Sequence, residues 1–349
     1  MEKKIKRTYV CRDIINHRIK SNIPLNYIPQ VADVGIFEVM HIGKHKNIQG
    51  FEKRNITIIA GDYIMGAFGT RYATAQFEGY VPDHLNQELH ILGAGGTIGV
   101  IKSMHYDYKD IGPTKLRFVG LATNDQGEVY NTKKLRAKNI VPFSGAAASA
   151  TKVILSLGSS MDSGKTTSAA YLAHGLKEAG HKVAYIKLTG TIYTKDCDLV
   201  NDLGADITAD FGDFGFPSTY MCSQKELFDL YESLLSKILT TQPDYVIMEI
   251  ADGLYERETK MLLTNKRFIS TIEAVIFSAG DSLSAISGIE VLNKWGIYPL
   301  AISGLFTASP LLVREVQENI DTPVFTIDEL GSADKIHVLF DRTRERVRI

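Results

Sequence analysis

A glycine-bounded loop followed by a lysine and two threonines is the part of this sequence with the clearest chemical meaning. It runs from Gly158 to Thr167 and reads GSSMDSGKTT. The backbone N–H groups of such a loop, together with the N-terminus of the helix that follows, bind phosphate. We expect Lys165 to reach the β- and γ-phosphates of a nucleotide and the Thr166 hydroxyl to bind Mg²⁺. The predicted nucleotide-binding residues are Gly158, Ser159, Ser160, Met161, Asp162, Ser163, Gly164, Lys165, Thr166 and Thr167.

Two details distinguish this loop from the common form of the motif. Five residues separate Gly158 from Gly164, where the usual pattern has four. Asp162 places a carboxylate inside the loop. Because that charge would repel phosphate, we expect Asp162 to face a substrate amine, a magnesium-bound water or a backbone N–H group.

Two strand-like segments after the loop carry further charged residues at their ends. The segment AYIKLTG carries Lys187, and YVIMEIADG carries Glu249 and Asp252. Ligands of open parallel sheets bind at the carboxyl ends of the strands, where these residues fall. We expect Glu249 to face the metal ion, and Lys187 and Asp252 to act with Lys165 in catalysis. For Lys187 a solvated surface position is the alternative.

The segment KDCDLVNDLGAD supplies a third candidate for the metal site. We predict that Asp198 joins Thr166 and Glu249 as a metal ligand, with Asp196 as the alternative. A solvated acidic helix face would also account for the run. The sequence leaves open which of Asp196, Asp198, Glu249 and Asp252 bind the metal.

Two later segments could contribute to substrate binding. The aromatic loop ADFGDFGFPSTYMC presents Ser218, Thr219 and Tyr220, which could bind polar groups of a substrate or belong to a packed surface loop. Arg257 could clamp a phosphate or act between subunits. It could equally pair with Glu256 or Glu258 on a helix surface.

The elements that must position these residues indicate an α/β protein of two domains. After residue 150, apolar strands alternate with amphipathic helices, which predicts a three-layer P-loop NTPase domain with a mostly parallel sheet over 150–349. Short strands with Gly and Asn/Asp turns predict a small β-rich domain, a barrel or a sandwich, over 1–145. Residues 1–30 read as an arm, and 142–152 as the linker.

The first half offers little chemistry of its own. The glycine-rich stretch 93–99 lies between strand-like runs, so we interpret it as a tight turn and not as a dinucleotide fingerprint. Arg71, Tyr72, His41 and His45 could line a substrate site, although the two histidines are better explained as residues around a turn.

The loop and the two strand ends together resemble dethiobiotin synthetase and its relatives among the SIMIBI-class P-loop proteins. The second half of the chain, from Lys152 to Leu330, is also similar to the P-loop domain of the uncharacterised DUF1611 family. The resemblance implies a substrate-side role for Lys187, although Leu188 replaces the proline that follows this lysine in dethiobiotin synthetases. Partitioning ATPases of the same class carry a second lysine early in the loop, which is missing here.

Composition sets limits on the partners and the compartment. The 349 residues are 44% hydrophobic and 23% charged, with a net charge of −1, as in ordinary globular proteins. The balanced charge gives no electrostatic reason to expect nucleic acid or an anionic membrane. No apolar run reaches the roughly 18 residues that span a bilayer. Three scattered cysteines favour a reducing cytoplasm, and we expect a homo-oligomer, a dimer or higher.

Together these features predict an ATP- and Mg²⁺-dependent enzyme, a phosphotransferase or a ligase. We expect it to act through the γ-phosphate on a small molecule, a carboxylate or a carbamate. The missing NKxD guanine motif favours ATP over GTP. Two alternatives remain at this point: a polynucleotide 5′-hydroxyl kinase, and a nucleotide-gated binding or regulatory module.

Overall fold

The computed structural model describes residues 4–24 and 26–346, and its chain divides into two compact units. The first unit contains Met1–Ile140 together with two later segments, Gly190–Thr194 and Phe211–Met221. The second contains Val141–Thr189, Lys195–Asp210 and Cys222–Ile349. The chain therefore leaves the second unit twice after residue 141 and returns each time.

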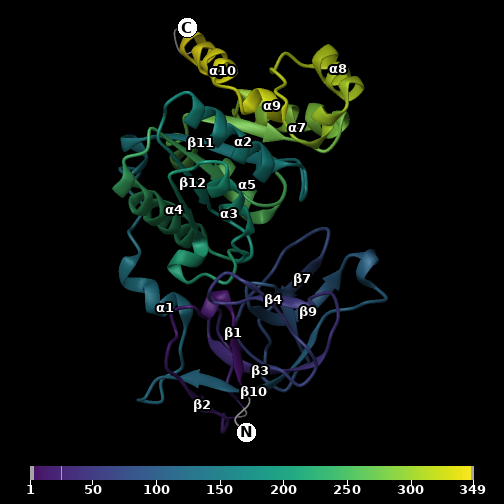
Figure 1. Cartoon of the computed structure of the whole chain (residues 1–349), viewed down its shortest axis with the longest axis vertical. Helices are drawn as coiled ribbons and strands as arrows, with labels where there is room; N and C mark the ends of the chain where they lie inside the picture. Colours follow the sequence, from purple (N-terminus) through teal and green to yellow (C-terminus); the bar gives the residue numbers. More distant parts are fainter. Residues whose placement is uncertain (1–3, 25, 347–349) are drawn as a thin grey trace. The chain divides into compact units, whose positions relative to one another are not determined.

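The first unit is built around a β-barrel (Figure 1). β6 pairs with β3, β3 with β10, β10 with β8, β8 with β9, and β9 again with β6, so the ring of strands closes. Closure leaves these strands without free edges. The expectation of a barrel or a sandwich is thus resolved as a barrel. The closed ring consists of β3 (Val34–His41), β6 (Tyr63–Phe68), β8 (Leu89–Gly93), β9 (Thr97–Met104) and β10 (Lys115–Thr123). The same sheet is extended by β1 (Ile5–Arg7), β2 (Arg18–Lys20) and β7 (Phe77–Tyr80). A separate two-stranded sheet is formed by β4 (Asn47–Gln49) and β5 (Asn55–Thr57).

The segment that the sequence predicts to be an N-terminal arm contains a short strand. β1 adds to the sheet by parallel pairing with β6, and the next residues, Tyr9, Val10 and Cys11, are buried. The polar, basic composition of the segment hid this role, because three residues are too few to show an alternating pattern. The glycine-rich stretch after β8 is the tight turn that the sequence predicted, since β9 follows it directly.

The second unit contains an entirely parallel sheet in the order β13-β12-β14-β11-β15-β16. The prediction of an α/β fold with a mostly parallel sheet and a β-rich N-terminal part is therefore confirmed. The strands are β11 (Lys152–Gly158), β12 (Val183–Lys187), β13 (Ile207–Asp210), β14 (Tyr245–Glu249), β15 (Ala274–Ser278) and β16 (Ala301–Ser303).

Helices cover both faces of this sheet, which makes three layers (Figure 1). On one face Ile154, Tyr185 and Ile247 share a core with α2 (Lys165–Glu178) and α3 (Lys195–Asp202). On the other face α4 (Gln224–Ile238) contacts β12 and β13, and Phe277 packs against Gly288 of α7 (Ser282–Lys294). The remaining helices are α1 (Thr132–Arg136), in the first unit, and α5 (Arg257–Leu263), α6 (Lys266–Ile269), α8 (Pro310–Asn319), α9 (Ile327–Leu330) and α10 (Ala333–Arg346).

The segment expected to be a linker is anchored to α4. The Glu232 carboxylate accepts hydrogen bonds from the Ser144 hydroxyl (2.7 Å) and from the backbone N–H groups of Gly145 (2.9 Å) and Ala147 (3.1 Å). Phe143 packs on Phe228 with ring centroids 4.8 Å apart. The small residues of this segment therefore fit closely against a helix within the second unit, instead of spanning a gap.

Candidate functional site

The glycine-bounded loop lies between a buried strand and a helix, as its chemistry requires. β11 ends at Gly158 and α2 begins at Lys165. Gly164 caps the helix with φ at 97°, a conformation that glycine adopts without strain. The Lys165 side chain is buried, and its Nζ donates to the carbonyl oxygen of Ser160, 2.6 Å away, so it folds back over the loop.

A polar cradle inside the loop fits a phosphate group. The Ser163 hydroxyl is buried and has no hydrogen-bond partner within the described structure. A Cβ atom at Gly158 would lie only 2.3 Å from this oxygen, so only glycine leaves the cradle open. An unpaired buried hydroxyl costs about 1–3 kcal/mol. A phosphate oxygen would remove that cost.

Glu249 lies at the centre of a cluster of polar side chains beside the loop. Its carboxylate is 1% exposed and accepts hydrogen bonds from the Thr166 hydroxyl (3.1 Å), the Tyr185 hydroxyl (2.8 Å) and Lys187 Nζ (2.8 Å). The first donor lies on α2, and the other two lie on β12, which pairs with β14 in parallel. The structure therefore brings together Thr166, Lys187 and Glu249, three of the residues that the sequence singled out.

The charges in this cluster shift the protonation equilibria of both lysines. Burial by itself would lower the pKa of Lys187, but the carboxylates of Glu249 and Asp196 outweigh burial and raise that pKa above its usual value. Burial lowers the pKa of Lys165; Lys187 adds to this effect, whereas Glu249, Asp252 and Asp162 oppose it. Lys187 is therefore held firmly as a cation between two carboxylates.

Asp196 of α3, the alternative to Asp198 in the sequence analysis, contacts this cluster through Lys187. Asp198 lies two positions further along the helix, and residues two apart on a helix do not face the same way. The predicted metal ligands Thr166 and Glu249 touch each other. The assignment of Asp198 as a metal ligand stays a prediction.

Tyr185 is a member of the cluster that the sequence analysis missed. It is fully buried, and burial, reinforced by Glu249, raises its pKa well above the usual value. A signal was present in the sequence, because Tyr185 lies two residues before Lys187 and alternate residues of a strand share a face.

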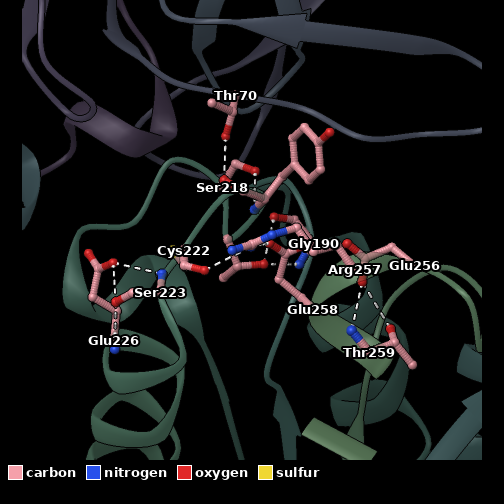
Figure 2. Close-up of polar contacts among 12 residues, drawn as sticks. Thr70, Gly190, Ser218, Cys222, Ser223, Glu226, Glu256, Arg257, Glu258 and Thr259 are labelled. Atoms are coloured by element: carbon pink, nitrogen blue, oxygen red, sulfur yellow. Dashed lines mark hydrogen bonds and ion pairs between the residues drawn. The ribbon is translucent and has the colours of Figure 1, made fainter. Parts of the chain in front are cut away.

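Most of the aromatic loop, Phe211–Met221, belongs to the first unit. The N–H group of Gly190 donates to the Thr219 hydroxyl (2.8 Å), and the Thr70 hydroxyl donates to the carbonyl oxygen of Tyr220 (2.7 Å; Figure 2). Tyr72 packs against Tyr220 with centroids 5.4 Å apart. Two predicted candidates, Tyr72 and Tyr220, thus lie together within this unit.

The remaining candidate site residues of the first half differ in how exposed their side chains are. His41 is exposed, whereas His45 and Arg71 are buried. Burial, with Arg71 and Lys44 nearby, lowers the pKa of His45 well below its usual value. His45 is therefore neutral and buried, and the structural role that we expect for it stays a prediction.

Comparison with known proteins gives weak structural likenesses. Neither a protein-family model nor a curated protein matches this chain. A DUF1611 family protein from Anabaena variabilis is 14% identical, covering 61% of this chain and 64% of its own, with a TM-score of 0.41. The signal recognition particle receptor FtsY from Elizabethkingia anophelis is 17% identical over 61% of this chain and 75% of its own, with a TM-score of 0.36. The hydrogenase maturation factor HypB from Archaeoglobus fulgidus is 12% identical over 61% of this chain and 98% of its own, with a TM-score of 0.37.

The family that the sequence resembles is thus represented among these structures. The identities and TM-scores are too low for a shared activity, substrate or partner to follow from the likeness. Within residues 4–24 and 26–346, no helix combines the length and apolar character needed to cross a bilayer.

Proposed function

We propose that this protein binds a magnesium–nucleotide complex in the loop Gly158–Thr167 and uses it in enzymatic chemistry. The observation that carries the proposal is the unpaired, buried Ser163 hydroxyl inside a loop that only glycine at position 158 leaves open. Lys165 and the N-terminus of α2 add positive charge at the same place. An anionic ligand with several oxygens satisfies all of these groups.

The residues present fit a nucleotide with its metal ion. Lys165 would exchange the Ser160 carbonyl for a phosphate oxygen, and the Thr166 hydroxyl would bind Mg²⁺. Glu249 would contact the metal directly or through water. No group of three or more His, Cys, Asp or Glu side chains that could hold a metal occurs among the described residues. Mg²⁺ is usually held by one or two carboxylates together with the phosphates of its substrate, which agrees with this arrangement.

The chemistry that we propose is transfer of the γ-phosphoryl group of ATP to an oxygen of a small carboxylate or carbamate, as in a kinase or a ligase. Mg-ATP would supply the γ-phosphoryl group, and its Mg²⁺ would neutralise part of the phosphate charge. Lys187, held as a cation, would orient the acceptor and stabilise its negative charge, and Asp252 would help to position the acceptor oxygen for attack on the γ-phosphate, with ADP as the leaving group. Catalysis of this type depends on positioning and charge more than on covalent chemistry. We propose a cytoplasmic homo-oligomer as the working form.

Isothermal titration with Mg-ATP and Mg-GTP tests the binding step. We expect micromolar to millimolar affinity, stronger for ATP, and weaker binding in Lys165→Ala. Exposed Lys294→Ala, at the end of α7, is the matched control. If neither nucleotide binds the wild type, the proposal is wrong.

Phosphoryl transfer is tested separately. The protein is incubated with γ-labelled ATP and panels of small carboxylates and amines with bicarbonate, and labelled products and released ADP are measured. We expect stimulation by at least one member of a panel. ATP hydrolysis that no small molecule stimulates would instead support a nucleotide-gated module.

A further inference from the structure

The turn that follows β16 packs against the nucleotide-binding loop through the main chain. The backbone N–H of Leu305 donates to the carbonyl oxygen of Ser163, 3.2 Å away. A Cβ atom at Gly164 would lie only 3.0 Å from the Cα atom of Gly304, so the two backbones touch. In the sheet, β15 separates β16 from β11, the strand that leads into the loop. A segment far along the chain therefore helps to shape the nucleotide-binding loop.

Gly304 has the backbone conformation that this close contact requires. Its φ is 110° and its ψ is −168°, a combination that is essentially confined to glycine. A Cβ atom there would lie 2.5 Å from the carbonyl oxygen of Ser163 and 2.6 Å from the backbone nitrogen and oxygen of Ala279. Both separations are shorter than real Cβ contacts, so neighbouring atoms would have to shift. Any larger residue at position 304 must therefore push the loop away from the turn or distort the end of β15.

The end of β15 holds this turn in place. The backbone N–H of Ala279 donates to the carbonyl oxygen of Ser303 (2.9 Å), and the backbone N–H of Phe306 donates to the carbonyl oxygen of Ala279 (3.3 Å). Both hydrogen-bonding groups of the Ala279 backbone are thus bound by residues that flank Gly304. The position of the turn is therefore set by the sheet, and not by the loop that the turn contacts.

The first half of the nucleotide-binding loop is held independently. The backbone N–H of Ser159 donates to the carbonyl oxygen of Ser278 at the end of β15 (2.9 Å). A Cβ atom at Gly253 would lie 2.5 Å from the carbonyl oxygen of Ser159, so the turn after β14 also touches this half of the loop. The predicted catalytic residue Asp252 belongs to that turn and has φ at 60°. Loss of the contact with the turn after β16 should thus displace the second half of the loop and leave the first half in place.

The contact with the turn after β16 sets the direction of two groups that would bind phosphate. In a planar trans peptide the carbonyl group and the N–H group of the next residue point in opposite directions. Because the Ser163 carbonyl points at the turn, the Gly164 N–H points away from it. Ser163 also carries the buried, unpaired hydroxyl of the phosphate cradle. The turn therefore determines how both of these donors are presented.

We propose that Gly304 is a positioning residue for phosphate binding. Because it has no side chain, the turn approaches Ser163 closely enough to hold its carbonyl oxygen. This contact keeps the Ser163 hydroxyl and the Gly164 N–H in the arrangement that binds phosphate. The inference rests on the proposed function, since the phosphate is that of the nucleotide. Gly304 acts through Ser163, and not by touching the ligand.

The test compares Gly304→Ala with the matched control Gly296→Ala, which lies just after α7. Both substitutions add a methyl group to a backbone with positive φ, which is 110° at Gly304 and 75° at Gly296. Within the described part of the chain, a Cβ atom at Gly296 would have no neighbour within 4 Å, so only Gly304→Ala presses on the loop. Mg-ATP affinity is measured by calorimetry. We expect it to fall about tenfold or more in Gly304→Ala and to stay within about twofold of the wild type in Gly296→Ala.

A double-mutant cycle with Ser163→Ala separates positioning from a general loss of stability. If Gly304 acts through Ser163, then Gly304→Ala should cost at least about threefold less affinity when the Ser163 hydroxyl is already absent. Thermal unfolding without nucleotide is recorded for every variant. Because both glycines have positive φ, we expect both glycine variants to melt at a lower temperature, but only Gly304→Ala to bind more weakly. Additive effects of the two substitutions on affinity would show that the positioning role is wrong.

Leu305→Pro decides the matter if Gly304→Ala does not fold. Proline removes the N–H that binds the Ser163 carbonyl, and it is well tolerated at the first position of a helix, which Leu305 occupies. We expect this variant to bind Mg-ATP about threefold or more weakly than the wild type. If the wild type binds nucleotide and the variants at 304 and 305 bind it equally well, the positioning role is wrong and the proposed function stands. If the wild type binds no nucleotide, both are wrong.

Discussion

Glu249 illustrates how a buried carboxylate is stabilised by neighbours from separate elements. Thr166, Tyr185 and Lys187 each donate a hydrogen bond to it, and Lys187 also supplies a positive charge. A buried charge without such partners would be strongly unfavourable. Lys187 therefore has a structural role as well as the substrate-side role that we predict.

The structural task of Lys187 can be measured by replacement with methionine. Lys187→Met leaves Glu249 buried without its cation, so we expect the free energy of unfolding to fall by about 3–5 kcal/mol. Urea denaturation at pH 7 gives the value. The double variant Lys187→Met/Glu249→Gln removes both charges and should recover part of the loss. A decrease below about 1 kcal/mol in the single variant would show that Lys187 does not stabilise the buried carboxylate.

Lys165 is the residue whose loss should affect nucleotide binding most directly. A hydrogen bond to a charged group contributes about 1.5–3 kcal/mol, so Lys165→Ala should weaken Mg-ATP binding by about 10- to 150-fold. Its buried side chain donates to a single backbone carbonyl, that of Ser160, within the described part of the chain, so folding should be affected far less. Calorimetry gives the affinity, and circular dichroism checks the fold. An unchanged affinity would place the nucleotide elsewhere.

At the scale of elements, α4 does more than cover one face of the sheet. Glu232 is buried, and it accepts hydrogen bonds from the segment that follows the first unit. Burial alone would raise the pKa of Glu232, but the hydrogen bonds from Ser144 and from two backbone N–H groups hold it below the usual value. A helix side chain thus anchors the segment with which the second unit begins.

This anchor should be sensitive to pH and to the loss of its charge. A depressed native pKa stabilises the fold above the unfolded pKa, and the stabilisation is lost as pH falls through the native pKa. We expect Glu232→Gln to lower stability by about 1–3 kcal/mol at pH 7, with a smaller difference below about pH 4. Hydrogen exchange at Gly145 and Ala147 should rise in the variant at pH 7. Unchanged exchange there would mean that Glu232 does not hold the segment.

At the scale of the whole molecule, the two units are not consecutive stretches of chain. The strands β12 and β13 belong to the second unit, yet the segments just beyond them belong to the first. Within the first unit Pro217 accepts from the Thr97 hydroxyl at 2.9 Å, and the Thr194 hydroxyl accepts from the Gln49 amide at 2.7 Å. The segments from the second half therefore complete the first unit by direct hydrogen bonds.

A fragment that starts at Val141 tests this organisation. It lacks the partners of Gly190–Thr194 and Phe211–Met221, so the amides of these segments should exchange with solvent much faster than in the full chain. Strand β14 at the centre of the sheet should keep its protection if the fragment folds. Hydrogen-exchange mass spectrometry compares the two forms. Equal protection of both segments in the fragment would show that they hold their structure without the first unit.

Local sequence patterns determined the strand–loop–helix of the nucleotide-binding loop, the parallel sheet and the β-rich first half. Strands and helices are marked by apolar residues that recur every two or 3.6 residues, and the loop motif occupies one short stretch. All of these can therefore be recognised in the sequence. Only the tertiary structure decided that β9 closes the barrel on β6, that Asp196 contacts Lys187, and that Gly190–Thr194 and Phe211–Met221 belong to the first unit. Each depends on contacts between residues far apart in the chain or on the direction in which a side chain leaves its helix. Composition and local periodicity carry no information about either.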